Sequence, residues 1–108
     1  MSTPIESSNI FIPAESIDYA ANAVVSKTIL KKPSGTITLF AFDKDEGLSE
    51  HTTPFEAVVE LLDGEAEITI GGNPFRLIAG QSIILPAHIP HALKATKQFK
   101  MVLTMIKG

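Results

Sequence analysis

The 108-residue chain contains no cysteine and no tryptophan. The absence of cysteine excludes disulfide bonds, thiolate metal ligands and a cysteine nucleophile. Basic residues form no run longer than Lys31-Lys32, and the formal net charge is −3. Nucleic acids and anionic membranes are bound through concentrated positive charge, so we expect neither as a partner.

Long apolar runs are also missing. No uninterrupted apolar segment approaches the length that spans a bilayer. The opening residues, MSTPIESSNIFIP, lack the basic and apolar regions of a secretory signal, so we expect a cytoplasmic protein. The sequence also lacks a phosphate-binding glycine loop, a nucleophile elbow and a zinc-protease helix.

What the chain does contain is enough apolar sequence for one packed domain. Hydrophobic residues make up 44% of the chain and charged residues only 19%, a composition typical of globular proteins. The mean hydropathy of +0.21 is high for so small a domain. We therefore expect a partner chain to cover part of its apolar surface.

Short β-type runs separated by turn residues begin at Val24 and continue to the end of the chain. The clearest hairpin places Asp63-Gly64 between AVVELL and EAEITI, as expected for a type I′ turn. Further turns are predicted around Gly35 and at Gly71-Gly72-Asn73-Pro74. Before Val24 we expect an arm, residues 1–23, with one short strand at Asn9 to Ile12. Many strands without intervening helices predict an all-β sandwich or barrel.

The strand that contains AVVELL has an alternating pattern. If Ala57, Val59 and Leu61 face one side, the side chains between them face the other. These other positions are Glu56, Val58, Glu60 and Leu62.

Two glycine-anchored segments resemble the motif pair of the cupin family. The second segment, GQSIILPAHIPHALKA, has Gly80, Pro86 and His91 at the family's spacing. The first, GLSEHTTPFEAVVELLDG, aligns His51 with the family's first histidine to within one residue. It departs from the pattern where Thr53 replaces the second histidine and Ala57 replaces the glutamate.

The resemblance covers about residues 35–106 and implies a small cupin of the conserved-barrel type. One domain, residues 1–108, would then consist of the arm and a jelly-roll β-barrel over about residues 24–106. In cupins the positions of His51 and His91 approach each other across the barrel, so the resemblance implies that they bind a metal ion or small ligand there. The candidate cofactor is one divalent transition metal ion, Zn, Fe, Ni, Cu or Mn; imidazole suits the first four best.

A third ligand has two candidates, each with an alternative. His88 either replaces the lost second histidine or is a turn residue that needs a positive φ, since the family has glycine there. Glu56 either belongs to a polar outer stripe or is turned inward by a β-bulge near Pro54.

The expected pocket is lined by Thr53, Phe55 and Ala57. These residues favour an apolar or weakly polar small molecule. Alternatively, side chains such as Phe40 and Phe42 fill the lumen and leave no room for a ligand.

Three functions remain open at this point. The barrel could be a binding module for a metal or small ligand. It could be a metal-dependent enzyme of the dioxygenase or isomerase type, which requires Glu56 or Glu50 to face inward. It could also be a metal-free barrel that serves binding or assembly. The resemblance further implies a homodimer. The apolar outer-face positions Val58 and Leu62, which a partner could cover, support this expectation.

Overall fold

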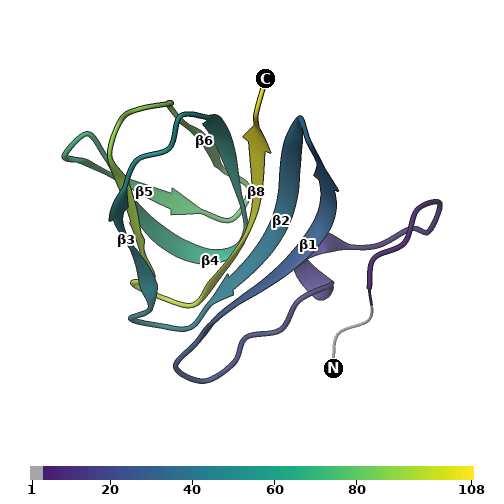
Figure 1. Ribbon diagram of the computed structural model, residues 1–108. Coiled ribbons are helices and arrows are strands. Elements are labelled where there is room, and N and C mark those ends of the chain that lie inside the picture. The colour runs from purple at the N-terminus through teal and green to yellow at the C-terminus, as the bar shows by residue number, and fades with distance from the viewer. Residues whose placement is uncertain (1–3) are drawn as a thin grey trace.

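The computed structural model describes residues 4–108, which fold into antiparallel strands and one short 3-10 helix (Figure 1). The elements are η1 (Pro13–Glu15), β1 (Val24–Lys32), β2 (Gly35–Phe42), β3 (Gly47–His51), β4 (Glu56–Ile70), β5 (Asn73–Ile78), β6 (Ser82–Leu85), β7 (His91–Lys94) and β8 (Phe99–Ile106). The strands curl into a jelly-roll barrel, which confirms the predicted all-β fold. Within residues 4–108, no helix has the length and apolar character needed to cross a membrane.

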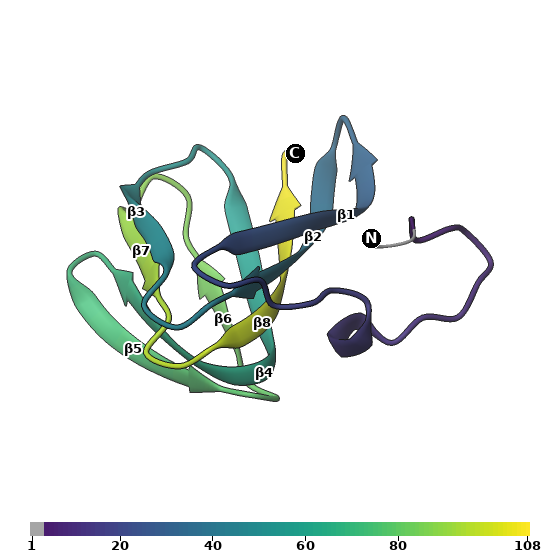
Figure 2. The ribbon, with the colours of Figure 1, turned by 90° about the horizontal axis from the view of Figure 1, so that it is seen from below.

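Two sheets share the long strand β4. The first sheet has the order β1-β2-β8-β4-β6, and the second has the order β3-β7-β4-β5. The arm leaves the barrel beside β1 and extends away from it (Figure 2). Because β4 runs through both sheets, its two halves form opposite walls of the barrel.

The hairpin predicted at Asp63-Gly64 is wrong, because β4 continues through both residues. The register between β4 and β8 shifts between Leu61 and Asp63, and Gly64 has a φ of 76°. A β-bulge therefore bends the strand from one sheet into the other. Gly64 lies so close to the backbone carbonyl of Gln98 that a Cβ atom would collide with it, so the site suits glycine for two reasons.

The turn predicted after Ile70 is confirmed at Gly71-Gly72, whereas Asn73 and Pro74 already belong to β5. Gly71 and Gly72 have φ values of 56° and 83° and connect β4 to β5, with Ile70 paired to Asn73. Two consecutive positive φ values are characteristic of a type I′ hairpin.

Two smaller predictions need correction. Asn9 to Ile12 form no strand, and Ile10 is fully exposed, because no neighbouring strand edge pairs with this part of the arm. In the β1–β2 hairpin, Gly35 begins β2 and pairs with Lys32. The turn itself is made by the two residues before Gly35, residues 33 and 34.

The main core lies between the two sheets. Ala57, Val59 and Leu61 face inward, as the alternating pattern predicts. The rings of Phe42 and Phe99 stack there with centroids 4.3 Å apart. Further apolar side chains pack against this core and are only partly buried; they include Phe40, Ile70, Ile83 and Leu103.

A second apolar cluster lies on the outside of the first sheet, beneath the arm. Ile17 of the arm packs there on Leu39, Ala41 and Val102. Nearby, the Tyr19 hydroxyl donates a 2.6 Å hydrogen bond to the Asp63 carboxylate. The arm is thus anchored across β2, β8 and β4.

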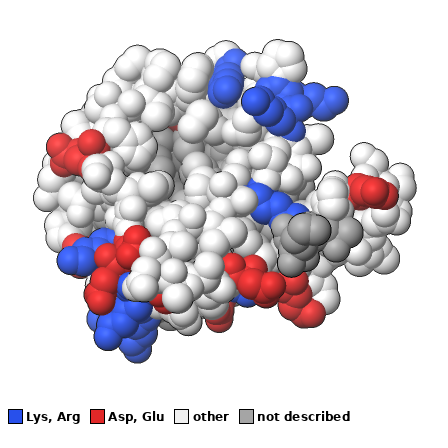
Figure 3. Space-filling view, turned by 60° about the horizontal axis from the view of Figure 1, so that its bottom comes forward, with Lys and Arg blue, Asp and Glu red and all other residues white. Residues whose placement is uncertain are grey.

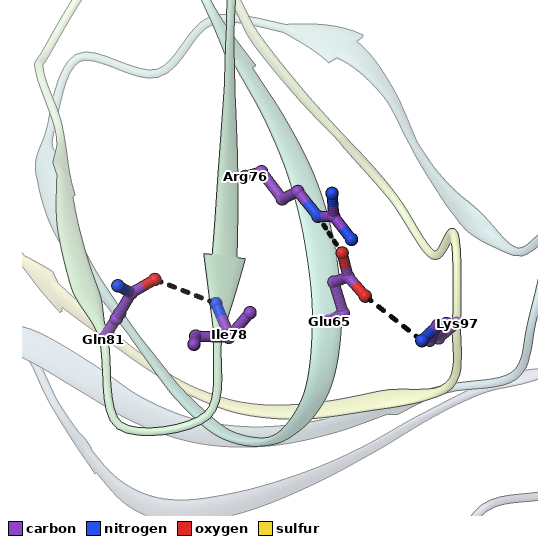
Figure 4. A network of polar contacts seen from close by, with 5 residues as sticks. All are labelled: Glu65, Arg76, Ile78, Gln81 and Lys97. Carbon is purple, nitrogen blue, oxygen red and sulfur yellow. Dashed lines mark hydrogen bonds and ion pairs between the residues drawn. The ribbon is translucent and has the colours of Figure 1, made fainter.

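Charged side chains on the second sheet form a polar network (Figure 4). Glu65 of β4 is 7% exposed and makes ion pairs with Arg76 of β5 and, at 3.6 Å, with Lys97 of the β7–β8 loop. The Gln81 side chain accepts a 3.0 Å hydrogen bond from the Ile78 amide. The ion pairs tie β5 and the β7–β8 loop to β4, and the Gln81 contact ties the β5–β6 loop to the end of β5.

Candidate functional site

Strand pairing brings His51 and His91 together in the second sheet. His51 ends β3, His91 begins β7, and the two residues are register partners. On its other side His91 pairs with Ile70 of β4. His91 is only 5% exposed, whereas His51 is exposed at the rim.

The two imidazole rings point their outer nitrogens at each other. The Nε2 atoms lie 3.1 Å apart, and the ring planes meet at 68°. Each inner nitrogen faces a backbone carbonyl oxygen two residues earlier in the chain. His51 Nδ1 is 2.7 Å from the Ser49 oxygen, and His91 Nδ1 is 3.3 Å from the Ile89 oxygen.

The contacts to the two carbonyl oxygens favour one tautomer in each ring. A carbonyl oxygen only accepts hydrogen bonds, so each Nδ1 must carry the proton that it donates. In a neutral imidazole the other nitrogen then has a lone pair and no proton. His51 and His91 therefore aim two lone pairs at the same small space, an arrangement that calls for a shared cation, either a proton or a metal ion.

The environment of His91 favours its neutral form. Burial lowers the pKa of His91, the hydrogen bond to the Ile89 carbonyl partly opposes this, and the nearby His51 lowers the pKa further. A neutral imidazole is the form that binds metal ions.

Neither candidate third ligand joins the histidine pair. His88 is exposed in the loop before β7, with a φ of 65°, the positive value that the turn interpretation required. Its backbone amide donates a 2.8 Å hydrogen bond to the Thr53 carbonyl. Glu56 is exposed and pairs with Ile106 of β8 on the outer side of β4, and Glu50 is exposed on β3.

Across residues 4–108, no three side chains of the His, Cys, Asp or Glu type gather closely enough to hold a metal ion. A metal at this site would thus have two protein ligands, with its other coordination positions left to water or a bound molecule.

The three expected pocket residues occupy different settings. Ala57 is buried in the interior opposite Leu85. Thr53 and Phe55 are partly buried in the segment between β3 and β4, where the Thr53 hydroxyl donates a 2.9 Å hydrogen bond to the Phe55 carbonyl. The Thr53 hydroxyl proton is therefore used in a hydrogen bond within the loop. Thr53, which stands where the family motif has its second histidine, stabilises the loop.

Sequence reasoning missed the carbonyl groups of Ser49 and Ile89, which orient the two rings. Both lie two residues before a histidine. The sequence carries no signal for them, because any residue supplies a backbone carbonyl.

A groove of about 480 Å³ lies elsewhere, where the arm folds back beside Lys27 of β1. It is distant in the fold from β3 and β7 and contains neither histidine. On the face drawn in Figure 3, acidic and basic side chains lie along the lower margin, basic side chains also gather at the upper right, and uncharged atoms cover much of the rest. The histidine pair therefore remains the strongest candidate site.

The donor set fits a transition metal ion. Zn–N bonds are about 2.0–2.1 Å long, so two nitrogens 3.1 Å apart can both reach one ion. Imidazole nitrogens whose second nitrogen donates to a carbonyl oxygen are a common metal-binding arrangement.

Comparison with solved structures shows close relatives. A conserved protein of unknown function from Streptococcus pyogenes is 34% identical, with 99% of this chain and 94% of that chain covered and a TM-score of 0.92. A cupin 2 conserved barrel domain protein from Leptotrichia buccalis is 41% identical over 87% of this chain and 46% of that chain, with a TM-score of 0.84. A cupin superfamily protein from Desulfitobacterium hafniense is 25% identical over 100% and 99% of the two chains, with a TM-score of 0.90.

No curated protein matches the chain. The model of the cupin domain family matches residues 38–107, which include most of β2 and every strand from β3 to β8. The chain therefore belongs to the cupin domain family.

Proposed function

We propose that the barrel binds one divalent transition metal ion through Nε2 of His51 and Nε2 of His91. The observation that carries the proposal is the convergence of these two atoms, 3.1 Å apart, with both Nδ1 atoms engaged by carbonyl oxygens. The ligand type favours Zn, Fe, Ni or Cu over Mn, which prefers oxygen ligands.

The metal would hold a small molecule beside the histidine pair. A site with two protein ligands leaves coordination positions for an oxygen or nitrogen atom of such a molecule, which the metal would polarise as a Lewis acid. Phe40, Ile70 and Leu103 are partly buried interior side chains. They suit a small molecule with an apolar body and one coordinating group.

An oxygenase site with two histidines and one carboxylate has less support. Such a site needs a glutamate beside the histidines, whereas Glu50 and Glu56 are exposed and join no cluster with them. We therefore propose a metal-dependent binding module in preference to an enzyme of that type.

A metal-free barrel is the competing function, because a proton shared between the two Nε2 atoms would also satisfy their lone pairs. The two alternatives differ in metal uptake. Untagged protein is stripped with a chelator, dialysed against Zn²⁺ or Ni²⁺, and its metal content is measured by elemental analysis and calorimetry.

The proposal predicts saturable binding of one ion per chain, which His51→Ala abolishes. His51 is exposed, so its loss should leave the fold intact, as circular dichroism can verify. His88→Asn is the matched control, since it removes another exposed histidine and asparagine tolerates a positive φ. Wild-type protein that takes up no metal, or uptake that survives His51→Ala, would contradict the proposal.

A further inference from the structure

The inward side of the β1–β2 hairpin changes from apolar to polar along its length. Phe42 of β2 lies in the main core, and Phe40 packs against it. Because side chains alternate along a strand, Thr38 and Thr36 of β2 point to the same side. Thr28 of β1 pairs with Thr38 and therefore shares this side. Three hydroxyl groups thus continue the inward surface beyond the two phenylalanines.

A β-bulge in β1 turns Lys31 to the same side. The register between β1 and β2 shifts between Thr28 and Leu30, which makes Ile29 one extra residue in β1. Ile29 packs in the cluster beneath the arm, on the outer side of the sheet, whereas Lys31 pairs with the inward-facing Thr36. Without the extra residue, Lys31 would point outward. Bulges that redirect a side chain in this way are common beside functional sites.

These polar groups have no partner within the described residues. The ion pairs of residues 4–108 are those of Glu65, so no carboxylate there pairs with the Lys31 ammonium group. The side-chain hydrogen bonds of the same residues include none to the hydroxyls of Thr28, Thr36 or Thr38. Thr36 and Thr38 are partly buried, and the other two side chains are exposed. An ammonium group with hydroxyl groups beside it is a donor set that suits an anion.

The histidine pair faces the same interior from the second sheet. His91 pairs with Ile70, which packs against the same core as Phe40. The turn of the β1–β2 hairpin lies at the same end of the barrel as the connection from β3 to β4, which follows His51 (Figure 1). A molecule between the two sheets at this end would therefore meet the histidines on one side and the polar hairpin on the other.

We propose that the molecule held beside the histidine pair is a small organic acid, whose carboxylate is bound by Lys31 and the threonine hydroxyls of the hairpin. The proposal rests on the proposed metal site, because the metal would coordinate an oxygen atom at the other end of the acid. Partly buried apolar side chains such as Phe40 and Leu103 suit the hydrocarbon chain of such a molecule. Dicarboxylates are the simplest acids with this pattern.

Calorimetry on zinc-loaded protein tests the proposal. The full chain is loaded with Zn²⁺ and freed of excess metal, and succinate, glutarate and adipate are titrated in, with the zinc content measured before and after. We expect at least one of these acids to bind. Lys31→Gln should weaken that binding at least about tenfold, since it removes the charge of the donor set. Lys31 is exposed, so this change should leave the fold and the zinc content unaltered.

Lys32→Gln is the matched control. Lys32 is the next residue of β1, pairs with Gly35 and points to the outer side of the sheet. The same loss of charge there should change the affinity less than about twofold in physiological salt. Charge reversal gives a second test. Lys31→Glu should abolish binding of the dicarboxylates and favour an ω-amino acid of the same length, because the ammonium group of that ligand would pair with the new carboxylate.

The outcomes distinguish a failure of this proposal from a failure of the metal site. Zinc-loaded protein that binds none of the three acids would overturn the proposal and leave the metal site intact, as would equal losses of affinity in Lys31→Gln and Lys32→Gln. Protein that takes up no zinc would overturn the proposed function itself and this proposal with it.

Discussion

His51 and His91 aim their Nε2 atoms at each other across 3.1 Å, while each Nδ1 faces the carbonyl oxygen of the residue two positions earlier. The same local geometry thus occurs on two strands that are distant in sequence and paired in space. When each Nδ1 donates to its carbonyl oxygen, both outer nitrogens of the neutral rings carry a lone pair.

This geometry predicts a nuclear magnetic resonance signature. In metal-free protein at neutral pH, long-range ¹H–¹⁵N spectra should show Nδ1 protonated in both His51 and His91. Added Zn²⁺ should shift the Nε2 resonances of these two rings and leave His88 unchanged. A ring that is protonated only on Nε2 in the metal-free protein would contradict the assignment.

Gly64→Ala should destabilise the protein by about 2 kcal/mol or more, because a new methyl group adds a collision with the Gln98 carbonyl to the cost of a positive φ. Gly72→Ala is the matched control, since Gly72 also has a positive φ but no atom lies within 4 Å of its added Cβ. It should cost about 1 kcal/mol. Urea unfolding measures both, and equal losses would show that crowding at Gly64 is unimportant.

The network around Glu65 should respond unequally to the loss of its two cations. Arg76→Ala should destabilise the protein by about 1 kcal/mol, because it removes the closer partner of a buried carboxylate; the exposure of Arg76 limits the loss. Lys97→Ala should cost less, since its ion pair spans 3.6 Å and its side chain is 72% exposed. Thermal unfolding of the two variants measures the difference, and the reverse order would refute this account.

Asp43 should contribute to acid sensitivity. Hydrogen bonds from the Asn22 amide, the Gln98 side chain and the Lys44 amide lower the pKa of Asp43 below its usual 3.8. The folded protein then binds this proton less readily than the unfolded chain, so the stabilisation is present above about pH 4 and is lost as the pH falls through the lowered pKa.

The measurement for Asp43 is the melting temperature between about pH 3 and pH 6 for wild type and Asp43→Asn. The wild type should be more stable at the upper end, and the difference should shrink toward the lower end. Asp18→Asn, an exposed position on the arm, serves as the control. A difference that grows as the pH falls would have the wrong sign for this mechanism.

Local patterns predicted the parts of the fold that depend on neighbouring residues. The inward direction of Ala57, Val59 and Leu61 follows from strand alternation, and the turn at Gly71-Gly72 follows from the need for positive φ. The Asp63-Gly64 prediction failed because the same dipeptide suits a hairpin and a bulge. The choice is made by β8, which pairs with β4 on both sides of that point.

The candidate site shows the same division. His51 and His91 were identified through the spacing of the cupin motifs, but the direction of their rings depends on the register between β3 and β7. That register joins segments 40 residues apart, and no local pattern in the chain specifies it. The position of His88 was similarly open until its φ of 65° placed it in a turn.

The shared strand β4, 15 residues long, pairs with β5, β6, β7 and β8. Because β4 belongs to both sheets, separating the strands of either sheet breaks hydrogen bonds to β4 and so also disrupts the other sheet. The barrel should unfold as one cooperative unit, with the amides of β4 among the last to exchange with solvent. A ligand bound between β3 and β7 would consequently slow exchange as far away as β2, on the opposite wall.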